Sequence, residues 1–408
     1  MIFENLSFKG YKWLRVSLFK IKSHSFINIF NFQCRALIYK IVNIIHYVFT
    51  TYNDHSVAYY NLFTLPLLST KVNSSKQDLF IRKNGISFFR RYFSNTPSIN
   101  FSLSDRASRS NFKLNPFWVA GFVDGEGCFS VIISKSNSLK VGWRVRVYFY
   151  IGLHVKDRAL LESIQNFFGV GNIYSATESL VRYQVNSFKD IKVIIDFFDK
   201  YKLITNKGAD FFLFKEVYTL MLNKEHLTLQ GLHKIVAIHA AINWGLTDQL
   251  KAAFPDIVPV LRPKVQFLNI PDPYWLAGFA SGEGCFFINI TKSNTYRSGF
   301  QIQLKFQLVQ HLKDETLMVG IREYLDCGST YKTRDCFSYQ VTKIGDIDDK
   351  ILPFFTKFPV LGVKAKDFVD FSRVLVLMKD NKLSLAMPGS DKLEQIKRIK
   401  SGMNKGRE

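Results

Sequence analysis

Acidic residues and cysteines are scarce in this chain. Its 408 residues include 33 Asp and Glu against 55 Lys and Arg, so the formal net charge is +22 at pH 7. This surplus makes a polyanion the first partner to consider, because binding to phosphates releases counterions. A membrane span is also lacking, since the best apolar run, residues 41–49, is about half of the roughly 18 residues required.

The cysteines exclude two further classes of protein. They are odd in number and contain no CxxC pair, which argues against a disulfide framework and against a zinc site. The five are Cys34, Cys128, Cys285, Cys327 and Cys336.

Residues 1–93 form an extension that is poor in acids and rich in Phe, Ile, Lys, Ser and Asn. Its end, Phe89-Arg90-Arg91-Tyr92-Phe93-Ser94, resembles a mitochondrial processing site with arginine two residues before the cut. Two interpretations stay open: a targeting segment, or a reading-frame extension fused to an upstream exon. Frequent Phe, Ile, Lys, Asn and Tyr fit an AT-rich genome such as that of an organelle. A protein encoded in the organelle would not need to be imported. We expect a mitochondrial location.

A long segment occurs twice. Residues 116–137 match residues 273–294 at 14 of 22 positions, and the same offset places Lys207 over Lys364. Such a repeat predicts two similar folding units. The resulting division is a linker or arm at 94–115, half-domains at 116–254 and 273–390, a proline-rich connector at 255–272 and a basic C-terminal tail at 391–408.

Each copy reads as helix, strand, strand, helix, strand, strand, helix. In residues 144–151 and 301–308, polar and apolar side chains alternate with the period of a strand. A helix follows at 160–168, after an expected N-cap at Asp157. We therefore predict an α+β protein with two pseudo-symmetric αββαββα half-domains, each an antiparallel saddle-shaped sheet with helices on its apolar face.

The other face of each predicted sheet is rich in hydrogen-bond donors and almost free of carboxylates. That composition suits base edges and phosphates, and a two-stranded ribbon fits the major groove of DNA. The predicted DNA-binding residues are Arg144, Arg146, Tyr148, Tyr150, Arg182, Gln184 and Asn186 in the first copy, and Gln301, Gln303, Lys305, Gln307, Ser338, Gln340 and Thr342 in the second.

The repeated motif carries one glutamate near the end of a helix with a small-residue face. In the first copy that face contains Ala120, Gly121, Gly125 and Gly127, which would let two helix backbones approach closely. We expect the two motif helices to join the half-domains there and to bring Glu126 and Glu283 together. Two close carboxylates repel each other unless a hard divalent cation such as Mg²⁺ lies between them.

These residues resemble the LAGLIDADG homing endonucleases, in the single-chain form with two motifs encoded in fungal mitochondrial introns. The nine-residue family motif matches 119–127 and 276–284, and the resemblance covers roughly residues 114–390. It implies a monomer that cuts both strands of a long DNA site across the minor groove and leaves short staggered ends.

The resemblance also implies roles for particular residues. Glu126 and Glu283 would hold Mg²⁺, for which Mn²⁺ is expected to substitute, with help from the carbonyls of Gly125 and Gly282. Lys207 and Lys364 match the family's basic-pocket lysines, which would stabilise charge on the phosphate. The catalytic set is completed by Gln310.

Two departures from symmetry and several alternatives remain. Gln310 falls where the family often has a polar residue that organises water, but the first copy has Leu153, so the two active sites are expected to differ. In the second copy, Ser281 stands where the first copy has Asp124, at a position not expected to bind metal.

The same fold could serve as a group I intron RNA maturase without cleavage, or as a repressor-like DNA-binding module. The glutamates could be plain helix-terminal acids, and the lysines ordinary surface residues.

Overall fold

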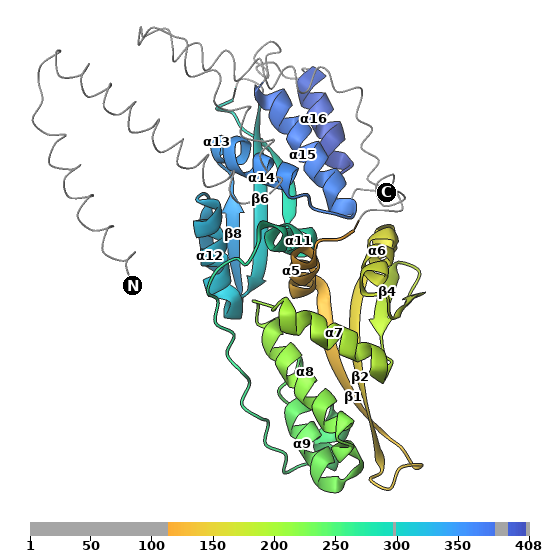
Figure 1. Cartoon of the computed structure of the whole chain (residues 1–408). Helices are drawn as coiled ribbons and strands as arrows, with labels where there is room; N and C mark the ends of the chain where they lie inside the picture. Colours follow the sequence, from red (N-terminus) through yellow and green to blue (C-terminus); the bar gives the residue numbers. More distant parts are fainter. Residues whose placement is uncertain (1–112, 297–298, 380–390, 405–408) are drawn as a thin grey trace, which may run out of the picture. The chain divides into compact units, whose positions relative to one another are not determined.

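The computed structural model describes residues 113–296, 299–379 and 391–404 (Figure 1). The expectations for the extension at 1–93, and for most of the linker at 94–115, lie outside the described residues. None of the helices in the described ranges is both long and apolar enough to cross a membrane.

The first half-domain contains one four-stranded antiparallel sheet in the order β1-β2-β4-β3. Helices α6, α7 and α8 contact β2 on one face of it. The elements are α5 (Pro116–Glu126), β1 (Gly127–Lys135), β2 (Trp143–His154), the 3₁₀ turn η3 (Val155–Asp157), α6 (Arg158–Phe168), β3 (Asn172–Ser175), β4 (Leu180–Val185), α7 (Phe188–Lys200), α8 (Lys207–Leu222), η4 (Glu225–Leu227), α9 (Leu229–His239) and α10 (Asp248–Ala253).

The second half-domain repeats this arrangement, with the sheet order β5-β6-β8-β7. The predicted αββαββα order is confirmed, and each copy continues with further helices, α8 to α10 in the first and α15 and α16 in the second. The elements are α11 (Pro273–Glu283), β5 (Cys285–Lys292), β6 (Phe300–His311), η5 (Leu312–Asp314), α12 (Glu315–Leu325), β7 (Ser329–Thr333), β8 (Cys336–Val341), α13 (Ile344–Asp346), the π-helical turn η6 (Ile347–Ile351), α14 (Leu352–Lys357), α15 (Val363–Lys379) and α16 (Asp391–Ser401).

Strand alternation places one face of each sheet in a core. In β2, Val145, Val147, Phe149 and Ile151 are buried while the residues between them are exposed or half-buried. Between the half-domains, residues 255–272 run without helix or strand. Arg262 in this connector forms an ion pair with Asp210 on α8 at 2.6 Å, which fixes the connector to the first half-domain.

The motif helices α5 and α11 form the contact between the half-domains (Figure 1). Each begins with proline at its first turn, and a side chain just before it caps a free backbone N–H: Asn115 accepts from Phe117 at 2.8 Å, and Asp272 accepts from Tyr274 at 2.7 Å. Each ends where its chain enters a strand directly, at Gly127 and Gly284.

Glycines set the distance between the two helices. A Cβ atom placed on Gly121 would lie 1.9 Å from the carbonyl oxygen of Trp275, and one on Gly278 would lie 1.9 Å from that of Trp118. Backbone thus touches backbone at both points, as the small-residue face predicts. Gly127 is an exception, because its added Cβ would meet Val123 of its own helix at 2.4 Å rather than the partner helix.

The two cores exchange residues across this contact. Ala277 of α11 packs in the first core, and Ala120 of α5 packs in the second. Burial of each small side chain in the opposite half-domain makes the two cores mutually dependent.

Two aspartates tie the half-domains together a second time. Asp157 was expected to cap α6, but its side chain makes no capping bond there and instead accepts the N–H of Val363, at the start of α15, at 2.7 Å. In the pseudo-symmetric position, Asp314 accepts the N–H of Asn206, just before α8, at 2.7 Å. We call these pairs the interdomain caps. A carboxylate is favourable at a helix N-terminus, where backbone N–H groups are unsatisfied.

The expectation of a tail at 391–408 is wrong for its described part. Residues 391–401 form α16, which packs on α15; Leu393 is buried, and Ile396 and Met403 belong to the second core. The apolar spacing of this short segment was obscured by its many charged residues, of which Lys392 is itself buried.

Asparagines with positive φ close both half-domains in the same way. Asn243 donates its N–H to Asp210 at 3.1 Å and its side-chain amide to the carbonyl of Phe129 at 2.8 Å. Asn404 makes the equivalent bonds at 3.1 and 3.2 Å to Asp367 and to the carbonyl of Phe286. The second copy therefore extends to Asn404, and α16 corresponds to α9.

Candidate functional site

The two motif glutamates lie at adjacent helix ends. A Cβ atom placed on Gly125 would lie 3.2 Å from Cγ of Glu283, and one on Gly282 would lie 3.0 Å from Cγ of Glu126. Each glutamate therefore crosses the glycine of the opposite motif, and the predicted convergence of the acids is found in the structure.

The electrostatics of this pair favour a cation. Burial, followed by the charge of Glu126, raises the pKa of Glu283, whereas a side-chain hydrogen bond from Gln310 lowers it. Among the described residues, no group of three or more His, Cys, Asp and Glu side chains is arranged so that it could hold a metal ion by itself. A divalent ion here would have two carboxylates and would complete its shell with water, carbonyl and phosphate oxygens, as Mg²⁺ commonly does. The residues present fit such an ion.

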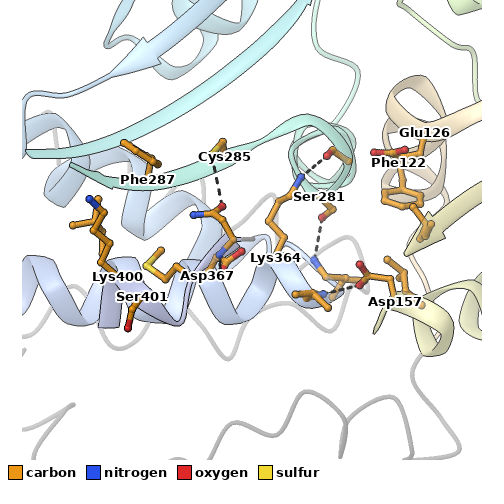
Figure 2. A pocket seen from close by; sticks show the side chains of 18 residues that line it. Phe122, Glu126, Asp157, Ser281, Cys285, Phe287, Lys364, Asp367, Lys400 and Ser401 are labelled. Carbon is orange, nitrogen blue, oxygen red and sulfur yellow. Dashed lines mark hydrogen bonds between the residues drawn. The ribbon is translucent and has the colours of Figure 1, made fainter. Parts of the chain in front are cut away.

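Lys207 and Lys364 contact the same site from the first turns of α8 and α15. The Lys207 ammonium donates to the carbonyl oxygen of Gly125 at 2.6 Å, and Lys364 donates to that of Gly282 (Figure 2). Burial lowers the pKa of both lysines, and the nearby acids oppose this effect. These buried contacts exclude the alternative that the two lysines are ordinary surface residues.

The lysine contacts bear on the expected metal-binding role of the two glycine carbonyls. Each carbonyl oxygen has two lone pairs, of which the lysine uses one. The arrangement leaves one lone pair on each oxygen for another partner.

The two halves of the site differ, as expected. Gln310 on β6 bonds Glu283, while its counterpart on β2 is the apolar Leu153. Leu153 lines a cavity of about 790 Å³ together with Glu126 and Lys364 (Figure 2). The apolar Leu153 thus offers Glu126 no side-chain amide of the kind that Gln310 provides to Glu283.

Asp124 supports the site instead of taking part in it. Its buried carboxylate accepts bonds from the N–H of Ile204 at 3.0 Å, from the N–H and hydroxyl of Thr205 at 3.1 and 2.6 Å, and from Nε1 of Trp275 at 2.9 Å. Burial raises the pKa of Asp124 to about 6 against the effect of these bonds. Through them α5 holds α11 and the loop before Lys207.

The second copy has a weaker version of this support. Ser281 accepts the N–H of Leu361 at 3.0 Å and donates to the carbonyl of Ala277 at 2.7 Å. Nε1 of Trp118, which corresponds to Trp275, is buried without a hydrogen-bond partner in the described structure. The second copy has Ser281 where the first has Asp124, which explains why Trp118 lacks the bond that Trp275 makes. The serine side chain is shorter, and its hydroxyl is already bonded to Leu361 and Ala277.

This asymmetry predicts different outcomes for two matched substitutions. Trp275→Phe should destabilise the fold by about 1.5–3 kcal/mol more than Trp118→Phe at a pH above 6, because only the former breaks a bond to a charged group. Loss of ring packing should be similar, since each indole stacks on a phenylalanine of its own helix at 4.9 Å. Urea unfolding measures both; equal destabilisation would contradict the assigned bond.

The predicted DNA-binding residues lie on the polar faces of the two sheets. Arg144, Arg146, Asn186 and Gln301 are exposed. Ser338 differs because it is buried, with an exposed fraction of 3%, opposite Tyr331 of β7. It is therefore covered in this structure. The half-buried ones are Tyr148, Tyr150, Arg182, Gln184, Gln303, Lys305, Gln307, Gln340 and Thr342.

Side-chain contacts organise these polar faces. The Arg182 guanidinium lies 4.5 Å above the ring of Tyr150, and Gln184 accepts the hydroxyl of Tyr174 at 2.6 Å. In the second sheet, Gln307 donates to the hydroxyl of Tyr331 at 3.0 Å. Such pairing presents donors in fixed positions, which direct readout of bases requires.

Several residues of these faces were missed from the sequence. Strands β1 and β5 pair with β2 and β6, strands β3 and β7 pair with β4 and β8, and all four add side chains to the same surfaces. For β1 and β5, the strand alternation after each motif was the signal that could have identified them. The additional residues are Ser130, Ile132, Ser134, Tyr174, Phe287, Asn289, Thr291 and Tyr331.

Two sheets with paired motif helices and converging acids define a two-motif nuclease fold. The family model described as LAGLIDADG endonuclease matches residues 119–218 and 276–375. The chain belongs to the LAGLIDADG endonuclease family. The predicted resemblance is thus confirmed.

Curated relatives carry related names. The chain is 38% identical over 289 residues to the probable intron-encoded endonuclease 3 of Neurospora crassa. This alignment covers 69% of this chain and 54% of that protein. It is 38% identical over 314 residues to the probable intron-encoded endonuclease 2 of the same organism, covering 72% and 68%. The chain thus spans about half of one of these relatives and about two thirds of the other.

Solved structures show the same fold. The I-SmaMI LAGLIDADG homing endonuclease bound to cleaved DNA is 44% identical, with a TM-score of 0.70 and coverage of 73% of this chain and 99% of that one. The LAGLIDADG meganuclease I-AabMI bound to uncleaved DNA is 42% identical, with a TM-score of 0.66 and coverage of 72% and 100%. The maturase alternative gains no support from these names.

Proposed function

We propose that the chain is a site-specific homing endonuclease that makes a staggered double-strand break in a long DNA target by metal-dependent hydrolysis. The observation that carries this proposal is the convergence of Glu126 and Glu283 between two polar sheet faces. Membership of the endonuclease family and the DNA-bound solved structures support it.

The chain would bind the duplex as a monomer, with its two polar sheet faces related by internal pseudo-two-fold symmetry. Their arginine, glutamine and tyrosine side chains contact base edges and phosphates, and the few carboxylates avoid repulsion from the backbone. Because each half-domain has its own sheet, the two copies together can follow a long target.

At the centre, Glu126 and Glu283 would bind Mg²⁺, with Mn²⁺ as a substitute. The bound ion supplies Lewis-acid chemistry and lowers the pKa of its water. Lys207 and Lys364 approach from either side, where their positive charge stabilises negative charge on a phosphate being cleaved. Gln310 holds the carboxylate of Glu283 and can orient a water beside it.

We also propose a mitochondrial location. Relatives are named as intron-encoded endonucleases, and one from Podospora anserina is named for an ND4 intron. The natural substrate would then be the uninterrupted insertion site in the gene that encodes the chain.

A cleavage assay tests this function. The full chain is incubated with a duplex that spans the uninterrupted insertion site, with Mg²⁺ or with EDTA, and the ends are mapped on both strands. We expect two cuts at staggered positions with Mg²⁺ and none with EDTA. Cleavage that persists in EDTA would refute metal-dependent hydrolysis, and tight binding without any cut would refute the nuclease assignment.

A further inference from the structure

Two lysines lie against one aromatic ring on the second polar sheet face. Phe287 of β5 is paired with Lys305 of β6 in the strand register, and the Lys305 ammonium lies 5.4 Å from the ring centroid. The ammonium of Lys400, from the last turn of α16, lies 6.0 Å from the same centroid. Neither lysine forms an ion pair with a carboxylate among the described residues.

One lysine of this pair lines the cavity that contains the first acid. Phe287 and Lys400 line the cavity of about 790 Å³ that also contains Glu126 and Lys364, and Glu126 lies on the opposite side of the view from them (Figure 2). Lys305 is not among the lining residues, but it contacts the same ring from β6. A phosphodiester strand bound at the Phe287 end of this cavity would therefore lie near both ammonium groups.

Lys400 is held in place by the end of its helix. Four residues later, Asn404 bonds to Asp367 of α15 and to the carbonyl of Phe286, the residue before Phe287. The ammonium is thus positioned relative to the strand by fixed backbone contacts as well as by the ring.

The equivalent place in the first half-domain carries a different residue. Asn243 corresponds to Asn404, and four residues before it is His239. Burial lowers the pKa of His239, which leaves this imidazole neutral near pH 7. The strand position that corresponds to Phe287 is Ser130. An ammonium pair over an aromatic ring therefore occurs at only one of these two equivalent places.

We propose that Lys305 and Lys400 together bind one backbone phosphate of duplex DNA at the Phe287 end of this cavity, so that α16 is part of the DNA-binding surface. The proposal rests on the proposed function for the presence of DNA and adds a site to it. Phosphate contacts fix the position of a duplex without reading its sequence. The first active site would consequently be anchored on the second half-domain by a contact that the other active site lacks.

The test is the salt dependence of binding to a random-sequence duplex. Full-length chains carrying Glu126→Gln and Glu283→Gln, to prevent cleavage, also carry Lys400→Met, Lys305→Met or both; methionine keeps an apolar stem against Phe287. The slope of log K against log salt is negative, and between about 50 and 200 mM salt the loss of one phosphate contact should reduce its magnitude by about 0.9. Each single variant should show most of this loss, and the double variant no more than about 0.9, because both lysines hold one phosphate.

Lys397→Met is the matched control, since Lys397 lies on the same helix, is paired with Glu394 at 2.8 Å and has its ammonium over the ring of Phe300 instead of Phe287. Its slope should not change. An unchanged slope for Lys400→Met would overturn the proposal while leaving the nuclease function intact, and additive losses would overturn the shared phosphate. If the unsubstituted chain binds no duplex, the proposed function fails together with this inference.

Discussion

A chain that carries Glu126→Gln and Glu283→Gln together will bind its DNA target and fail to cut it. The amides keep the shape of the crossed side chains but remove both negative charges that hold the cation. Because a bound divalent ion contributes several kcal/mol of transition-state stabilisation, cleavage should fall by about 10³-fold or more. Rates of double-strand cleavage, measured with gel-shift affinities on the same duplex, separate the chemical step from binding.

The fold of this double variant should be at least as stable as that of the parent. Burial and the charge of Glu126 disfavour the ionised form of Glu283, so neutral amides relieve both effects. Glu162→Gln is the matched control, because Glu162 is exposed on α6 and forms an ion pair with Arg158 of the same helix. The Glu162→Gln variant should cleave the duplex at the rate of the parent chain. Full cleavage by the double variant would remove the two acids from the mechanism.

Gly278→Ala will prevent the half-domains from packing. The new Cβ would lie 1.9 Å from the carbonyl oxygen of Trp118 and 2.9 Å from the N–H nitrogen of Phe122. Both are backbone atoms of α5, so the helices can separate only by opening the contact between the two cores. We expect a loss of more than about 4 kcal/mol of unfolding free energy, at the upper end of single substitutions.

Thermal unfolding and soluble yield measure this effect. The pseudo-symmetric Gly121→Ala should behave similarly, since its Cβ would lie 1.9 Å from the carbonyl oxygen of Trp275. Gly345→Ala in α13 serves as control because nothing lies within 4 Å of its added Cβ. If Gly278→Ala melted like the control, the close approach of the motif helices would be incorrect.

The repeated motif was sufficient to predict the centre of the molecule. The period-two alternation identified β2 and β6, and the glycines of the motif helices indicated that Glu126 and Glu283 would meet. These features are local: they depend on the strand period, on small side chains and on a repeat that the two copies still share.

Features that depend on contacts between distant segments could not be predicted in this way. Asp157 has the sequence position of an N-cap, yet its carboxylate is used 206 residues later along the chain, at Val363. The match of α16 to α9 keeps identities such as Leu232 with Leu393 and Ile235 with Ile396, but it lies at an offset of 161 residues instead of 157. The shared bonds of Asn243 and Asn404 establish its register. Likewise, strand alternation puts Ser338 on the correct face but cannot indicate that the residue is covered.

The interdomain caps determine what an exchange of half-domains between related nucleases must preserve. Asp157 of the first half accepts the N–H of Val363 in the second half, and Asp314 of the second half accepts the N–H of Asn206 in the first. Each half therefore contributes a carboxylate whose hydrogen-bond donor lies in the other half. A chimera that matched the motif helices alone would leave both carboxylates, and the N–H groups they accept, without partners. Recombining specificities from two such proteins therefore requires compatibility at three places: the glycine crossing and both caps.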